Sequence, residues 1–275
     1  MSIVDAIILA IVEGLTEFLP VSSTGHMIAT SYLLGIHQDE FTKLYEVSIQ
    51  FGAILAVVVL YWRKFFEFRR WQFYAKLAIG VLPALILGFL FSGTIDDLLE
   101  SPTTVAITML AGGIILIFID NLFKVHTIES DDQITFPKAF VVGCWQVLAM
   151  IPGVSRSAAS IIGGMQQKFT RHLAAEFSFF IAVPTMLAAS CYTIFLKTWD
   201  NGYVKRKGYE IIMQTNENIT SFIVGNIVAF IVAMLAIRLF INYLKIYGFR
   251  AFGFYRILGG IILLIIILSG IMEVS

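Results

Sequence analysis

The sequence predicts an all-α polytopic membrane protein, with six transmembrane helices and two re-entrant helix hairpins arranged as an inverted repeat. Three observations lead to this prediction. The composition is apolar, because 58% of the 275 residues are hydrophobic, mean hydropathy is +0.85 and only 14% are charged; soluble domains carry about 25% charged residues. Six apolar segments approach the length of a membrane span, and two others are interrupted by polar residues. Parts of the pattern also occur twice.

Charge and cysteine content narrow the function classes. The chain carries 19 basic and 19 acidic residues, whereas a nucleic-acid partner would call for a clustered basic excess. Cys144 and Cys191 stand alone inside apolar segments, which is typical of small packing residues rather than of a zinc site. Membrane lipids are therefore expected partners and nucleic acid is not, while a homodimer is left open.

The predicted spans follow from length. A transmembrane helix needs about 20 apolar residues, and six segments come near that number: 45–62, 76–93, 103–122, 175–197, 219–243 and 253–272. Residues 3–36 and 137–168 fit badly, because Pro with Gly or Ser divides each of them into halves too short to span. Irregular backbone at membrane depth survives only where protein or a water-filled cavity satisfies it. Both regions are therefore predicted to be re-entrant helix–loop–helix hairpins.

Basic residues predict the orientation. The segment "RKFFEFRRW" after the first span carries four basic residues. The next loop, "SGTIDDLLESP", carries three acidic residues and no basic residue. Cytoplasmic loops carry the excess of Lys and Arg, so the first segment is expected inside and the second outside. Both termini then lie outside, as does 198–218, whose basic run 205–207 argues against this orientation.

The chain resembles itself in three places. "VEGLTEFLPVSSTG" at 12–25 aligns with "WQVLAMIPGVSRSA" at 145–158, "EVSIQFGAILA" with "EFSFFIAVPTM", and "AGGIILIFI" with "LGGIILLII". Three matches in the same order favour one membrane domain over 1–275 built from repeat halves of about 1–123 and 137–272. Each half has a hairpin and three spans, so the second half is inverted, and inverted repeats place a site near the midplane.

Two acids stand out in the first hairpin. Glu13 and Glu17 are four residues apart and share one helix face. The structural alternative is a capping or snorkelling role, which suits them poorly so far inside an apolar helix. Intramembrane ionisable groups usually mark function. The pair is therefore predicted to be catalytic and to bind a divalent cation, Mg²⁺ or Ca²⁺, which prefer oxygen ligands.

Hydroxyls precede a helix in both hairpins. Ser22, Ser23 and Thr24 stand before one helix, and Ser155, Arg156 and Ser157 before the other. Each hydroxyl has the alternative of a plain N-cap. Two helix N-termini facing one pocket would form an anion site suited to phosphate. Ser22, Thr24, Ser155 and Ser157 are thus predicted to bind substrate, and Arg156 to match phosphate with its forked guanidinium or to form a structural Arg–Glu pair.

His26 follows Ser23 by about one helical turn. It is predicted to be catalytic, by taking a proton from Ser23, attacking phosphorus itself or protonating a leaving oxygen; a buried packing histidine is the alternative. Glu46 and Glu176 begin the spans after each hairpin. They are either supports for the site or ordinary helix-start acids.

The motifs "EGLTEFLPVSSTGH" and "PGVSRSAAS" resemble the signatures of the bacterial undecaprenyl-diphosphate phosphatase family, also called the bacitracin-resistance family. The resemblance runs along the whole chain. It implies six spans with two re-entrant regions, a divalent metal and an active site open to the outer side of the inner membrane. It also implies removal of one phosphate from undecaprenyl diphosphate, which recycles the lipid carrier of cell-wall precursors.

The resemblance implies a catalytic role for the six residues of this sequence that match the family's catalytic positions: Glu13, Glu17, Ser23, His26, Ser155 and Arg156. Ala158 and Ser160 depart from the Gly and Thr that the family often shows, which puts backbone detail in doubt rather than the chemistry. The inverted repeat, taken alone, also fits an alternative hypothesis, that the protein is a polyprenyl-phosphate flippase or transporter. The dense set of carboxylates, hydroxyls and histidine favours the enzyme, because transport needs no nucleophile.

Overall fold

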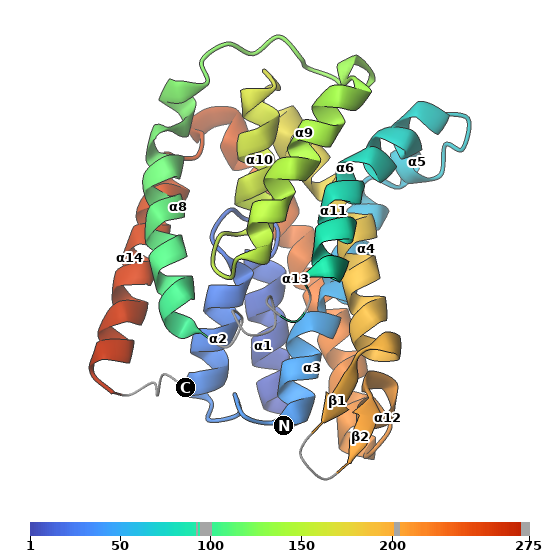
Figure 1. Ribbon diagram of the computed structural model, residues 1–275, viewed down its shortest axis with the longest axis vertical. Coiled ribbons are helices and arrows are strands. Elements are labelled where there is room, and N and C mark those ends of the chain that lie inside the picture. Colours follow the sequence, from blue (N-terminus) through green and yellow to red (C-terminus); the bar gives the residue numbers. More distant parts are fainter. Residues whose placement is uncertain (92, 94–100, 201–203, 271–275) are drawn as a thin grey trace.

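The computed structural model describes residues 1–91, 93, 101–200 and 204–270, and within them it is almost entirely helical (Figure 1). Six helices are long and apolar enough to cross a membrane, as the sequence predicts. They are α3 (Glu40–Ser48) continued by α4 (Gln50–Leu60), α6 (Trp71–Leu90), α8 (Pro102–Leu122), α11 (Arg171–Cys191) continued by the π-helix η3 (Tyr192–Leu196), α13 (Asn216–Tyr247) and α14 (Arg250–Leu268).

The two interrupted regions form helix–loop–helix units. The first contains α1 (Ile3–Thr16) and α2 (Ser23–Leu33); the second contains α9 (Phe136–Val147), the 3₁₀ turn η2 (Leu148–Met150) and α10 (Arg156–Gln166). The longest of these α-helices has 14 residues, about 21 Å at the α-helical rise, which is short of a hydrocarbon core about 30 Å thick. Figure 1 shows the two units approaching from opposite ends, with both connecting loops near the middle.

The remaining elements are short. They are α5 (Trp62–Phe65), the 3₁₀ turn η1 (Asp131–Gln133), α12 (Gly208–Ile212) and the antiparallel strands β1 (Thr198–Asp200) and β2 (Lys205–Lys207). The two strands fall in the segment predicted to lie outside, and residues 201–203 of that segment are outside the described residues. Most of the acidic loop used to predict orientation, 92–102, and the last two residues of the predicted span 253–272 are outside them too.

Small residues let the helices cross closely, as is common in membrane proteins. A Cβ on Gly143 of α9 would lie 2.2 Å from the carbonyl oxygen of Gly80 on α6, and one on Gly14 of α1 would lie 2.9 Å from that of Ala229 on α13. Large apolar side chains such as Leu235 remain exposed on the helix exteriors, where lipid suits them. These crossings fix both helix–loop–helix units against the long helices.

Ion pairs hold together the end of the molecule where α5 lies. Arg70 Nη2 contacts Asp131 Oδ2 at 2.8 Å and Asp132 Oδ1 at 2.7 Å, and Lys64 Nζ contacts Asp131 Oδ1 at 3.3 Å. The hydrogen bond from Arg70 lowers the pKa of the exposed Asp132 carboxyl. This network joins the segment after the first span to η1, so basic residues gather at that end.

Candidate active site

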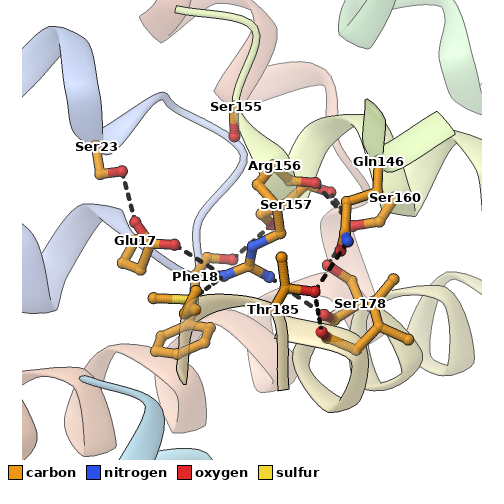
Figure 2. Close-up of polar contacts among 12 residues, drawn as sticks. Glu17, Phe18, Ser23, Gln146, Ser155, Arg156, Ser157, Ser160, Ser178 and Thr185 are labelled. Atoms are coloured by element: carbon orange, nitrogen blue, oxygen red, sulfur yellow. Dashed lines mark hydrogen bonds and ion pairs between the residues drawn. The ribbon is translucent and has the colours of Figure 1, made fainter. Parts of the chain in front are cut away.

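The two loops between the short helices meet in the interior. Ser157 Oγ donates to the carbonyl oxygen of Phe18 at 2.8 Å, in a fully buried hydrogen bond. Arg156 Nη2 donates to Glu17 Oε1 at 2.8 Å, which makes a partly buried ion pair between residues 139 positions apart. Figure 2 shows the guanidinium between Glu17 on one side and Ser178 on the other. Residues of the two motifs, Glu17 of the first and Arg156 of the second among them, are therefore brought together.

Equivalent serines end the two loops. Ser22 and Ser155 have φ of 73° and 72°, a region that residues other than glycine seldom adopt. Each caps the following helix, because Ser22 Oγ accepts from Gly25 N at 3.3 Å and Ser155 Oγ accepts from Ala158 N at 3.2 Å. These are the N-cap contacts given above as the alternative for single hydroxyls. They bring the N-termini of α2 and α10, with their positive dipole ends, to the meeting point of the loops.

Glu17 connects the hydroxyl to the cation. Ser23 Oγ donates to Glu17 Oε2 at 2.6 Å, while Glu17 Oε1 accepts from Arg156 (Figure 2). Glu17 is 7% exposed and Ser23 is only partly buried. A serine hydroxyl bonded to a carboxylate that is itself oriented by a third group has the arrangement of an activated nucleophile.

Arg156 is held on several sides but keeps one donor unused. Nη1 donates to the carbonyl oxygen of Ser178 at 3.2 Å, and the guanidinium carbon lies 5.5 Å from the centre of the Phe18 ring. Ser160 Oγ donates to the carbonyl oxygen of Arg156 at 2.8 Å. Ser160, which departs from the family pattern, therefore still supplies a hydroxyl that makes a hydrogen bond. Within the described residues, the buried Nε of Arg156 has no hydrogen-bond partner. An anion oxygen would satisfy it.

Glu13 lies deeper, one turn before Glu17. It is 1% exposed, and within the described chain its Oε1 has no hydrogen-bond partner. Its carboxyl interacts electrostatically with those of Glu17 and Glu46 and with the guanidinium of Arg156. Glu46 therefore adjoins the site. Glu176 belongs elsewhere, because its carboxylate pairs with Lys64 and His172, each at 3.7 Å.

His26 has different neighbours from those expected. Its Nδ1 lies 2.7 Å from the carbonyl oxygen of Ser22, and its Nε2 lies 2.7 Å from the hydroxyl of Tyr255. A carbonyl oxygen only accepts, so Nδ1 carries the proton. The hydroxyl of Ser23 is turned to Glu17 instead. Thr24 is half-buried beside these groups, and its predicted role in substrate binding stays a prediction, as do those of Ser22, Ser155 and Ser157.

Arg256 of α14 is a central residue that the sequence analysis missed. Its side chain is fully buried, and its nitrogens donate to five backbone carbonyl oxygens at 2.8–3.4 Å: those of Pro20, Gly153, Val154, Thr108 and Met109. It thereby ties both loops to α8 and α14. The signal was present, since an arginine inside the last apolar span is an intramembrane charge.

The carboxylates fit a cation that arrives with a substrate. Among the residues described, no group of three or more His, Cys, Asp or Glu side chains is placed to hold a metal ion. Mg²⁺, however, is commonly held by one or two carboxylates, with water and substrate phosphates completing its shell. The unpartnered oxygen of Glu13 next to Glu17 suits that mode rather than an all-protein cage.

Comparison with known proteins points in one direction. The family model described as Bacitracin resistance protein BacA matches residues 6–262. A protein named undecaprenyl-diphosphatase from Flavobacterium psychrophilum is 53% identical, covering 97% of this chain and 96% of that protein. Proteins of the same name from Porphyromonas gingivalis and Bdellovibrio bacteriovorus are 50% and 46% identical, with at least 98% of both chains covered in each case.

Proposed function

The chain belongs to the BacA family of undecaprenyl-diphosphatases, and we propose that it removes the terminal phosphate of undecaprenyl diphosphate at the cluster of Glu17, Ser23 and Arg156. The observation that carries this site assignment is Glu17, whose two carboxylate oxygens bond the Ser23 hydroxyl at 2.6 Å and the Arg156 guanidinium at 2.8 Å. Nucleophile, base and phosphate-binding cation then stand side by side at the meeting of two helix N-termini.

Ser23 attacks the phosphorus in this proposal. Its Oγ bonds to the terminal phosphorus while its proton passes to Glu17 Oε2. The bond from phosphorus to the bridging oxygen breaks, and undecaprenyl phosphate leaves with that oxygen. Water then attacks the phosphoserine, the bond from phosphorus to Oγ breaks, and Glu17 returns its proton to Ser23. Inorganic phosphate is released.

His26 serves the second step. Its Nε2 carries a lone pair because Nδ1 donates to the Ser22 carbonyl. It lies one turn after Ser23 on α2. In this proposal the attacking water takes the place of the Tyr255 hydroxyl at Nε2, and His26 accepts the proton of the water and passes it to the departing phosphate. Proton transfer by a positioned side chain typically contributes about 10²–10⁴-fold in rate.

Arg156 and the helix N-termini hold the negative charge. The transferred phosphoryl group carries spread-out charge in its transition state, and preorganised donors in a site with little water stabilise such charge strongly. Arg156 Nε, buried without a partner in the described chain, is the donor for one phosphate oxygen. The backbone N–H groups at the start of α2 and α10 supply others.

Glu13 and Glu17 would hold a divalent cation, Mg²⁺ or Ca²⁺, together with the diphosphate. Such an ion neutralises phosphate charge and polarises the phosphorus–oxygen bonds. Because Glu17 already bonds Ser23 and Arg156, the unpartnered oxygen of Glu13 is the more available ligand.

In the membrane, α1–α2 and α9–α10 would form the two re-entrant hairpins of an inverted repeat. Three features support this: the shortness of these helices, their approach from opposite ends (Figure 1) and the shared positive φ of Ser22 and Ser155. The positive-inside rule assigns the basic end near α5 to the cytoplasm. In a bacterial inner membrane the N-terminal end of α1 and the C-terminal end of α14 would then face outward. We propose that the site opens to that outer side.

The test uses protein purified in detergent, with no second compartment. Phosphate release from undecaprenyl diphosphate is measured for the unaltered chain, for Ser23→Ala and for Glu17→Gln. Each variant is expected to lose about 10²–10⁴-fold in rate. Ser269→Ala is the control, since that hydroxyl bonds Ile266 at the exposed end of α14. If the unaltered protein releases no phosphate, the activity is wrong; if Ser23→Ala matches the control, the site assignment is wrong.

A further inference from the structure

Tyr255 lies beside His26 from the other end of the chain. Its hydroxyl is 2.7 Å from His26 Nε2, and the two ring planes are parallel within 2°, with centres 5.5 Å apart. The ring is 49% exposed, so Tyr255 stands where the buried site meets its surroundings. None of the motifs that predicted the site contains it.

The hydrogen bonds on the imidazole define its state. Nδ1 donates to the Ser22 carbonyl, so the neutral ring can only accept at Nε2, and the Tyr255 hydroxyl is the donor. The two bonds together fix the tautomer and the ring orientation, which is how histidines in metal and catalytic sites are commonly set. The lone pair of Nε2 is thereby directed at the Tyr255 hydroxyl.

The next residue anchors Tyr255. Arg256 is fully buried and donates to backbone carbonyls of both loops and of α8, including Gly153 at 2.8 Å and Pro20 at 3.3 Å. This clamp fixes α14 relative to the loop that leads into α2. The distance between the Tyr255 hydroxyl and His26 is thus set by a rigid junction rather than by a flexible side chain at the surface.

We propose that Tyr255 is a positioning residue for the phosphatase reaction: its hydroxyl donates to Nε2 and so keeps His26 neutral and oriented, in the Nδ1–H tautomer, until the attacking water takes its place. The catalytic role of His26 in this inference rests on the proposed function, whereas the hydrogen bond from Tyr255 to His26 does not. Tyr255 acts through the imidazole. Its removal should therefore lower kcat, leave KM nearly unchanged and have no effect once His26 is gone.

The decisive measurement is ¹⁵N NMR on histidine-labelled protein in lipid bilayers, with His26→Ala used to assign the signal. We expect His26 to show a protonated Nδ1 and a bare, hydrogen-bonded Nε2, and Tyr255→Phe to change the Nε2 shift. Tyr247→Phe is the matched control, because Tyr247 is exposed and its ring packs at a tilt against that of Tyr243 rather than against His26. Identical His26 signals in the unaltered protein and Tyr255→Phe would overturn the proposal whether or not the protein is active.

Kinetics supply a second test. The loss of one neutral hydrogen bond should reduce kcat of Tyr255→Phe by about two- to tenfold. A double-mutant cycle with His26→Ala, run at high enzyme concentration, should show that Tyr255→Phe adds no further loss. The same loss in both backgrounds would show that Tyr255 acts independently of His26, and a raised KM with unchanged kcat would make it a substrate contact instead.

Discussion

Replacing Arg156 by lysine separates catalysis from structural support. Arginine here contacts Glu17 at 2.8 Å through Nη2 and the Ser178 carbonyl at 3.2 Å through Nη1, and its Nε remains buried without a partner in the described chain. A lysine keeps the positive charge but has one compact ammonium and no planar fork. It can pair with Glu17, but it cannot at the same time present a second, fixed donor to a phosphate oxygen.

The expected magnitude follows from that one lost contact. A hydrogen bond to a charged group contributes about 1.5–3 kcal/mol, and about 1.4 kcal/mol corresponds to a factor of ten. Arg156→Lys should therefore lower kcat/KM roughly ten- to a hundredfold. Arg156→Ala should lose more, and it also leaves the Glu17 carboxylate buried without its cation, which typically costs about 3–5 kcal/mol of stability.

The assay is phosphate-release kinetics and thermal unfolding on the same purified samples. Arg171→Lys is the matched control, because Arg171 Nε makes a 2.6 Å ion pair with Asp120 outside the cluster. The competing explanation is an ion pair that only holds the two loops together. Arg156→Lys with an unchanged kcat/KM and a lowered melting temperature would support that explanation and refute the catalytic one.

Three further predictions concern the loops and the cation. Ser157→Ala removes the buried bond to the Phe18 carbonyl and should cost about 1 kcal/mol of stability, visible as a lower melting temperature; an unchanged melting temperature would contradict the cross-loop role. Gly153→Ala should destabilise by more than about 1 kcal/mol, because φ is +86° and a Cβ would lie 2.1 Å from Thr108 Oγ1; wild-type expression and melting would argue against this loop conformation. Chelation should abolish phosphate release and added Mg²⁺ or Ca²⁺ should restore it, so full turnover of metal-free protein would remove the metal role of Glu13 and Glu17.

The sequence predicted the features that depend on local pattern. Six spans follow from runs of about 20 apolar residues, and the breaks at Pro20 and Pro152 predicted the helix–loop–helix units. An acid or a phosphate was predicted as the partner of Arg156, because a charge among apolar segments needs one; the structure shows that Glu17 is that acid. The alignment of the two motifs pairs Ser22 with Ser155, and the structure gives both residues a positive φ.

Long-range neighbours could not be predicted in the same way. Tyr255 and His26 are 229 positions apart, and no spacing rule links them. The buried bond of Ser157 to Phe18 likewise depends on how the loops interlock. The alignment of the two halves also pairs Glu46 with Glu176. Only Glu46 interacts with Glu13 of the site. Glu176 forms an ion pair with Lys64 instead.

The proposal that Ser23, bonded to Glu17, is the nucleophile carries the whole mechanism. It is tested most directly by mixing the enzyme with undecaprenyl diphosphate labelled at its terminal phosphate, quenching within one turnover and locating the label on the digested protein. We expect an acid-stable phosphoserine at Ser23, absent from Ser23→Ala. An acid-labile phosphohistidine at His26, with Ser23 unmodified, would contradict it.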